Sequence, residues 1–247
     1  MRKIYILWLR EIKKYLRSKS RVIGTLGMPL LFLFVLGFGL NSALKVNETN
    51  YINFIFPGVI AMAVLMNSMF SGISVIWDKQ FGFMKEMLVA PVSRTVIMIG
   101  KTLGGATTAV FQGLIIFLIA LIAGVNFPSI YGLLIALLFM ALIGIAFTSL
   151  GVSFASRMED MQAFPIIMNF VVMPLFFLSG ALFPLDQVPN ALKIIAMINP
   201  LTYGVDALRF GFIGVSHFPI LLDLAVLSGF CVFMIAAGAY LFNKMEI

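Results

Sequence analysis

The chain has 247 residues, of which 62% are apolar, and its mean hydropathy is +1.08. Soluble domains are about half apolar, so this composition excludes an ordinary soluble protein and indicates an integral membrane protein. The formal net charge is +7, but the basic residues do not form a clustered face with groups that read bases or backbone, which excludes nucleic-acid binding.

The first 21 residues contain eight of the seventeen Lys and Arg residues. Residues 4–17 repeat apolar side chains at helical spacing, and Trp8 and Tyr15 share the apolar face. An amphipathic helix with a basic face lies in the membrane interface, so we expect an interface helix and lipid contact here. The alternative is that the basic residues only retain the N-terminus in the cytoplasm. The predicted basic face consists of Arg10, Lys13, Lys14 and Arg17.

Six apolar blocks follow, each long enough to supply the roughly 20 residues that cross about 30 Å of hydrocarbon. They leave no room for a separate globular domain. We therefore expect one all-α, polytopic membrane domain over residues 1–247 with six transmembrane helices. The predicted spans are 22–44, 54–77, 102–124, 131–154, 163–183 and 220–242.

Loop charge predicts the orientation of these spans. With six spans, fourteen of the seventeen basic residues fall on one side of the membrane. Basic residues near helix ends stay on the cytoplasmic side, so we expect both termini in the cytoplasm and the chain in the plasma (inner) membrane. The predicted inside segments are 1–21, 78–101, 155–162 and 243–247.

Residues 184–219 are apolar enough to suggest a seventh span. Asp206 and Arg209 would then lie near mid-bilayer, at a cost of about 2.5–3.5 kcal/mol each. Pro189 and Pro200 also interrupt the segment. We expect two short helices that lie on, or dip into, the outer leaflet.

The spans contain few polar groups. Asn67 and Ser71 share one face of the second span, and Asn169 lies in the fifth. Such residues form interhelical hydrogen bonds or line a pathway.

Gly100 and Gly104 predict a close helix contact. None of the six blocks has an ionisable residue at its middle, which disfavours an ion-coupled carrier and favours energy supplied from outside the bilayer.

Residues 77–101 mix charged and apolar side chains in an inside loop. The pattern predicts a short amphipathic helix that ends before Pro91, because a proline ring disfavours helical backbone at the preceding residue. A cytosolic protein could bind this helix by helix-in-groove packing. On the pattern alone, a solvated connector explains it equally well.

The sequence predicts no ATP, cofactor, metal or catalytic site in this chain. Residues 99–102 end like a phosphate-binding loop, but the full pattern requires glycine where Thr95 stands. His217 is the only histidine and has no neighbouring residues of metal-ligand type. The chain is therefore not expected to be an enzyme.

Two long motifs carry a resemblance to a known family. Residues 78–94 read DKQFGFMKEMLVAPVSR, and FLSGALFPLDQVP at 177–189 is followed by NPLTYGVDALR at 199–209. Together they resemble type-2 ABC exporter permeases, in particular the daunorubicin-resistance and nodulation-protein-like branch. Gln80 departs from that family, which often has an acidic residue there, so an ion pair made at this position by relatives is not expected here.

The resemblance implies a half-permease that pairs with a second copy of itself or a paralogue to enclose a pathway. Two cytosolic ABC ATPase subunits would supply ATP and Mg. By this resemblance, residues 4–17 form the interface helix, residues 81–90 the coupling helix between spans two and three, and residues 184–215 short re-entrant outer helices that close the exit.

The resemblance also implies roles for individual residues. The ATPase-coupling residues would be Phe81, Gly82, Phe83, Lys85, Glu86, Leu88, Pro91 and Arg94, joined by Trp8, Arg10, Lys13, Lys14 and Arg17 of the interface helix. The translocation path would include Asn67, Ser71, Asn169 and Met173, and the outer gate Phe183, Pro184, Pro200 and Tyr203.

The residues and the resemblance together predict that the chain is part of an ATP-driven exporter. The uncharged interior predicted for its spans suits a hydrophobic or amphipathic cargo. A drug, a lipid or a lipid-linked glycan fits that description, and multidrug efflux is one such activity. Two alternatives stay open: a secondary carrier or channel that works without ATP, and a membrane assembly factor that has no pathway.

Overall fold

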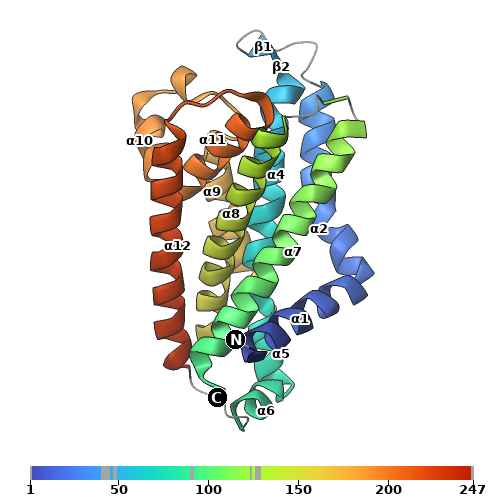
Figure 1. Ribbon diagram of the computed structural model, residues 1–247, viewed down its shortest axis with the longest axis vertical. Helices are drawn as coiled ribbons and strands as arrows, with labels where there is room; N and C mark the ends of the chain where they lie inside the picture. The colour runs from blue at the N-terminus through green and yellow to red at the C-terminus, as the bar shows by residue number, and fades with distance from the viewer. Residues whose placement is uncertain are drawn as a thin grey trace.

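The computed structural model describes residues 2–39, 45–46, 49–89, 92–122, 124–125 and 129–245. Long apolar helices run along the vertical axis of Figure 1 and form the body of the protein. They are α2 (Lys19–Phe32), continued by the π-helix η1 (Leu33–Phe38), α4 (Tyr51–Ser71), α7 (Arg94–Ile122), α8 (Ile130–Arg157), α9 (Ala163–Phe177) and α12 (Ile220–Asn243).

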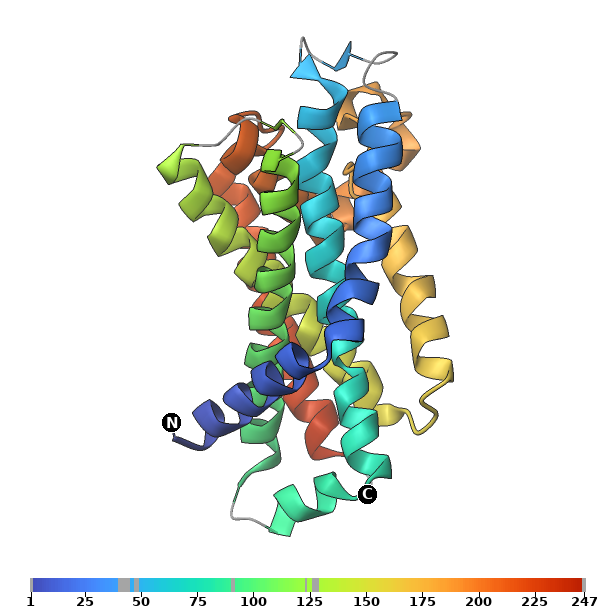
Figure 2. The ribbon, with the colours of Figure 1, turned by 90° about the vertical axis from the view of Figure 1, so that its right-hand side faces the viewer.

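Short elements cover the two ends of this bundle. At the end that holds Arg2 and Met245, α1 (Arg2–Arg17) lies across the bundle, next to α5 (Ile73–Gln80) and α6 (Phe83–Val89) (Figures 1 and 2). Helix α1 is bent by 72° from the helix that follows it, as an interface helix before a span would be. The opposite end carries the antiparallel pair β1 (Lys45–Val46) and β2 (Thr49–Asn50), η2 (Leu185–Gln187), α10 (Asn190–Ile198) and α11 (Pro200–Ile213).

The described part of the chain contains four helices that are long and apolar enough to cross a membrane, and a fifth if α1 and the bent segment after it count as one span. The expected number of six is therefore not confirmed. Helix α9 has only 15 residues, because the predicted block 163–183 loses its helical backbone after Phe177 and turns at Gly180, where φ is +73°. The end of the first block, 40–44, lies outside the described residues. The four helices are α4 with α5 (Tyr51–Gln80), α7, α8 and α12.

The helix that contains the third predicted span begins before the first residue of that span. Helix α7 starts at Arg94, so Lys101 lies within a helix and not in the loop 78–101. The predicted coupling helix 81–90 is likewise shorter, since α6 runs from Phe83 to Val89. The apolar block 102–124 was bounded by the charge of Lys101, whereas the helical backbone of α7 includes Lys101 and begins at Arg94.

The core lies where α4, α8 and α11 meet. Phe56, Phe139 and Phe147 are fully buried there. Phe212 of α11 packs against Phe56 and Phe117, with both ring centroids 5.1 Å away. Helix α11 is thus embedded among the long helices and does not lie flat on a surface.

The buried position of α11 places two charged residues inside the protein. Asp206 accepts hydrogen bonds from the backbone N–H groups of His217 and Phe218 at 2.9 Å. Arg209 lies 4.0 Å over the ring of Phe54 and donates to the Gly180 carbonyl at 3.0 Å. These internal partners replace water, so the two charges do not face the hydrocarbon that made a seventh span improbable on sequence grounds.

Glycines allow several helices to touch backbone to backbone. A side chain at Gly100 would lie 2.6 Å from Cβ of Leu7, and one at Gly104 would lie 2.5 Å from Cβ of Glu11, so α1 packs directly on α7. The close contact predicted for this glycine pair is confirmed. Gly72 and Gly151 likewise allow close contact where the junction of α4 and α5 crosses α8.

We expect Gly72→Ala to destabilise the protein by about 1–3 kcal/mol, because the added methyl group would collide with the Gly151 backbone, which cannot rotate away. Thermal unfolding of the purified chain in detergent measures this. Gly229→Ala is the matched control, since nothing lies within 4 Å of its added methyl group. Equal unfolding temperatures for the two variants would contradict the close contact.

Candidate coupling site

Helix α6 forms the tip of the protein at the end that carries α1 (Figure 2). Large apolar side chains are exposed here: Phe83 of α6 is 47% exposed, Val89 89%, and Phe81, just before the helix, 66%. Met84 of α6 is fully buried and holds the helix to the bundle. Gly82, with φ +79°, makes the turn between α5 and α6, a conformation that favours glycine. An exposed apolar surface of this kind marks an interaction site.

The polar residues predicted for this tip divide into two groups. Lys85 and Glu86 are exposed on α6. Arg94 instead donates hydrogen bonds to the carbonyl groups of Asn243 and Met245, both at 2.8 Å, and so joins the start of α7 to the end of α12. The Leu88 side chain and Pro91 lie outside the described residues.

A buried cluster of charges lies directly behind the tip. Asp78 of α5 accepts two hydrogen bonds from the Arg10 guanidinium, at 3.0 and 3.2 Å, and one from Lys101 at 2.5 Å. Lys14 lies 3.9 Å from the same carboxylate, and Glu11 lies 3.3 Å from Lys101. The side chains of Asp78 and Lys101 are only 1% and 2% exposed. This ion cluster joins α1, α5 and α7 at one point.

Sequence reasoning missed the ion cluster, although a signal for it was present. Asp78 follows one predicted span and Lys101 precedes the next, so an antiparallel pair of helices brings the two opposite charges together. Lys101 does not form part of a phosphate-binding loop, because it is buried in α7 against Asp78. Burial lowers the pKa of the Lys14 ammonium, and the nearby carboxylates of Asp78 and Glu11 partly offset that effect.

Aromatic contacts connect α1 to the same tip. Arg10 lies 5.9 Å from the ring centroid of Phe83, and Lys14 lies 5.2 Å from that of Trp77. The opposite side of α1 packs on α7, where the Trp8 indole N–H donates to Thr107 at 2.9 Å. Tyr15 donates to Gln112 of α7 and is almost fully buried, so this face meets protein and not only the acyl region that its periodicity suggested.

The loop after α8 also contacts α5. The Gln80 amide donates to the Glu159 carbonyl at 2.6 Å, and Lys79 donates to the Ser156 carbonyl at 3.4 Å. A neutral amide therefore binds backbone at the position where the resembling family often has an acid. Movement of α6 would reach α1, α7 and the loop after α8 through short, polar contacts.

Comparison with known families agrees with this arrangement. The family model described as ABC-2 type transporter matches residues 2–213. The chain belongs to the ABC-2 type transporter family. It is a membrane permease domain, and it contains no ATPase domain.

Individual relatives of this ABC-2 permease cover most of its length. Nodulation protein J of Rhizobium leguminosarum bv. trifolii is 30% identical over 211 residues, which is 84% of this chain and 78% of the relative. Inner membrane transport permease YadH of Escherichia coli K12 is 28% identical over 233 residues, or 92% and 89%. Putative transport permease ycf38 of Cyanophora paradoxa is 28% identical over 214 residues, or 85% and 74%.

The residues predicted for the translocation path of the permease have different surroundings in the structure. Asn67 is fully buried and donates to Thr108 of α7 at 3.2 Å, and the Ser71 hydroxyl donates to the Ser68 carbonyl. Asn169 instead lies on the exposed side of α9, and Met173 is half-buried. Of the two roles expected for a polar residue in a span, Asn67 has the first: it makes an interhelical hydrogen bond.

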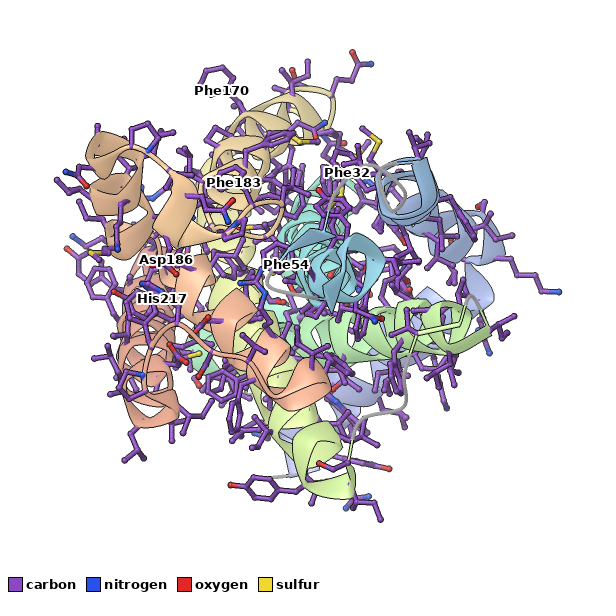
Figure 3. The ribbon with its side chains drawn as sticks, turned by 90° about the horizontal axis from the view of Figure 1, so that it is seen from above. Phe32, Phe54, Phe170, Phe183, Asp186 and His217 are labelled. Atoms are coloured by element: carbon purple, nitrogen blue, oxygen red, sulfur yellow. The ribbon has the colours of Figure 1, made fainter. Side chains whose placement is uncertain are left out.

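The residues predicted for the outer gate lie around α11. Pro200 begins that helix, and the Tyr203 hydroxyl donates to the Met197 carbonyl at 2.8 Å. Phe183 and Pro184 are half-buried in the segment that leads to η2. Nearby, Nδ1 of His217 lies 3.3 Å from Asp186 (Figure 3). The described residues hold no group of three or more acidic, histidine or cysteine side chains placed to bind a metal ion.

Proposed function

We propose that the chain is the membrane-spanning subunit of an ATP-driven exporter and that the tip around α6 binds a cytosolic ABC ATPase. ABC-2 permeases in general work with such a subunit, which would carry the ATP and Mg. The observation that supports this is the exposed apolar surface of Phe81, Phe83 and Val89 directly in front of the ion cluster. A loop that only connected two spans would not need a buried ion cluster to fix its position.

The contacts of the tip suggest how ATPase movement would reach the bundle. Asp78 connects α5 to α1 and α7, and Gln80 connects it to the loop after α8. A push on α6 would therefore move several helices as one packed unit, the kind of rigid-body change by which transporters switch between inward- and outward-open states. Residues 4–17 would act as a lever, since α1 shares the ion cluster.

The exposed face of α9 supports a dimer. Asn169 would present its amide to lipid in a lone chain, although polar groups within a membrane normally face protein or water. Phe170 is 83% exposed and points outward from the same helix, and Ile166 is 71% exposed (Figure 3). A second copy or a paralogue packed on α9 would cover these residues and leave Asn169 and Met173 along a shared pathway.

Six spans are part of this proposal. The segment α2–η1 and the short helix α9 would cross the membrane beside α4, α7, α8 and α12, with the termini in the cytoplasm of a plasma (inner) membrane. The Escherichia coli relative is named as an inner membrane transport permease. Phe183, Pro184, Pro200 and Tyr203 would then lie at the exit as an outer gate.

The proposed cargo is hydrophobic or amphipathic, such as a drug, a lipid or a lipid-linked glycan. Apart from Asn169, the open face of α9 offers apolar side chains and no ionised group. Such a surface suits an uncharged, oily molecule better than a small ion. Export and multidrug efflux belong to the proposal on the same ground.

The test is reconstitution in liposomes with and without the ATPase subunit that co-purifies with the chain. We expect uptake of a fluorescent amphipathic compound into inside-out vesicles only when both ATP and the ATPase are present. Transport by the chain alone under an ion gradient would favour a secondary carrier. A stable complex that hydrolyses ATP but never moves cargo would favour an assembly factor.

A further inference from the structure

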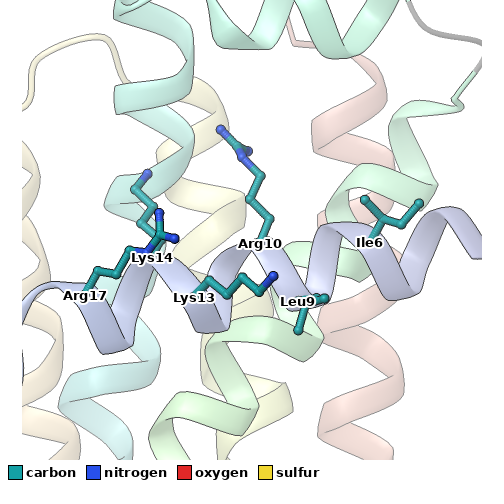
Figure 4. A pocket seen from close by; sticks show the side chains of 6 residues that line it. All are labelled: Ile6, Leu9, Arg10, Lys13, Lys14 and Arg17. Carbon is teal, nitrogen blue, oxygen red and sulfur yellow. The ribbon is translucent and has the colours of Figure 1, made fainter.

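The face of α1 that points away from α7 contains a basic cavity (Figure 4). Its volume is about 530 Å³, and the described residues that line it all belong to α1. Its lining residues are Ile6, Leu9, Arg10, Lys13, Lys14 and Arg17. Nothing in the coupling of α6 to the bundle requires this recess to exist.

Helix geometry shows which way the cavity opens. Trp8 and Tyr15 mark the side of α1 that packs on α7. At 100° per residue, Lys13 lies about 150° around the helix from them. The Lys13 side of the cavity therefore faces away from α7, while Arg10 and Lys14 form its other edge, next to α5.

The cavity has more positive charge than its surroundings can neutralise. Asp78 and Glu11 are close to these cations and also serve the buried Lys101, and Glu86 of α6 acts on Arg10 as well. The four lining cations and Lys101, set against these three carboxylates, leave a formal charge of +2. Lys13 and Arg17 are exposed and form no ion pair with any described residue. An anionic ligand would complete this balance.

Apolar surface lies on both sides of the basic groups. Ile6 is 56% exposed at the edge of the cavity, and Leu9 lies next to Lys13 in its lining. A separate apolar recess of about 420 Å³ lies on the opposite side of α1, between this helix and α7. It is lined by Ile4, Tyr5, Trp8, Leu103 and Thr107. Helix α1 thus has a basic recess on one side and an apolar recess on the other.

We propose that the basic cavity of α1 binds the phosphate headgroup of an anionic phospholipid, whose acyl chains lie along the apolar side of the helix. Arginine guanidinium and lysine ammonium groups both bind phosphate, the former through paired hydrogen bonds. Anionic lipid attracts interface helices through such residues. A bound lipid would hold α1 at a fixed depth, and with it the ion cluster that Arg10 and Lys14 share with Asp78.

The position of the cavity favours lipid over an acidic protein segment. Helix α6 projects past α1 at the tip of the molecule, where an ATPase would approach (Figure 2). Arg10, at one edge of the cavity, reaches Met87 and Phe83 of α6, whereas Lys13 and Arg17 are exposed on α1. The proposal does not depend on transport, and its test can be made without ATP.

The two tryptophans of the chain provide the measurement, because Trp8 lies on α1 and Trp77 packs against Lys14. The full chain would be reconstituted in phosphatidylcholine vesicles with a minor fraction of phosphatidylglycerol, and bromine placed on the acyl chains of one lipid or the other. We expect brominated phosphatidylglycerol to quench fluorescence more strongly at equal mole fraction. In Lys13→Gln/Arg17→Gln, this preference should fall by about tenfold or more, since each basic residue near an anionic surface contributes roughly fivefold.

The double variant Arg2→Gln/Arg157→Gln is the matched control, because it removes the same charge from exposed positions outside the cavity. It should keep clearly more of the preference than Lys13→Gln/Arg17→Gln does, because its two residues contribute only through the general attraction of the anionic surface. Equal quenching by the two brominated lipids, or an unchanged preference in Lys13→Gln/Arg17→Gln, would overturn the proposal. So would displacement by inorganic phosphate at constant ionic strength, which would indicate a soluble-anion site. Loss of ATPase binding with an unaltered lipid preference would assign the cavity to the protein partner.

Discussion

Asp78→Asn is expected to lower the free energy of unfolding by about 3–5 kcal/mol and to abolish ATP-dependent transport. Removal of one member of a buried ion pair leaves its partner buried and unpaired, which costs about that much. Lys101, with 2% of its side chain exposed, would retain its hydrogen bonds to Ser74 but only one described carboxylate, Glu11, while Arg10 and Lys14 would repel it. Thermal unfolding of the purified permease measures the first effect, and transport in liposomes the second.

The variants Lys101→Met and Asp78→Asn/Lys101→Met complete a double-mutant cycle. The double variant should be more stable than the sum of the single losses predicts, because neither charge is then left alone in the protein. It should still fail to transport, since α5 no longer has an ionic contact with α7. Glu159→Gln, at an exposed carboxylate, is the control. If Asp78→Asn unfolds at the same temperature as Glu159→Gln, the ion cluster does not hold these helices together.

The ion cluster illustrates what hydropathy cannot predict. The apolar blocks gave the positions of the long helices, because a helix in lipid must present apolar side chains over its whole length. The same rule ends each block at the first charge, so Asp78 and Lys101 were assigned to a loop. Their pairing depends on how two antiparallel helices pack, and α1 adds Arg10 and Glu11 from a distant part of the sequence.

Residues 184–219 give a second example of what hydropathy cannot predict. Asp206 and Arg209 argued correctly against a span exposed to lipid, but they did not predict that α11 would be buried among α4, α8 and α12. Burial is tolerated because backbone N–H groups bind Asp206 and the Phe54 ring covers Arg209. From one sequence, the free-energy cost of placing such charges in the bilayer can be estimated, but the partners that offset it cannot be identified.

Polar residues within the spans could be assigned to a face but not to a role. Periodicity put Asn67 and Ser71 on one side of the second span, and the structure turns Asn67 toward Thr108 of α7. Asn169 lies on the exposed side of α9 and has no such neighbour among the described residues. The sequence alone cannot distinguish the two asparagines, because the difference lies in which helix happens to stand opposite.

Gly82→Trp is expected to reduce ATP-dependent transport by about tenfold or more while the protein still folds. Gly82 has φ +79°, a conformation that costs other residues about 1–2 kcal/mol, yet nothing lies within 4 Å of an added Cβ. The bulky side chain would therefore shift α6 and project from the docking tip without filling the core. Loss of one central residue in a protein interface commonly has an effect of this size. Transport and cargo-stimulated ATP hydrolysis in liposomes measure it.

Gly124→Trp separates backbone strain from the loss of docking. Gly124 also has positive φ, +91°, and open space around its Cβ, but it lies in the connection between α7 and α8, at the end of the bundle opposite α6. Both variants should therefore lose similar stability, and only Gly82→Trp should lose coupling. Glu86→Ala, which removes an exposed charge from α6 without straining its backbone, should also weaken ATPase binding. If Gly82→Trp and Glu86→Ala both transport like Gly124→Trp, the ATPase must act on the permease somewhere other than α6.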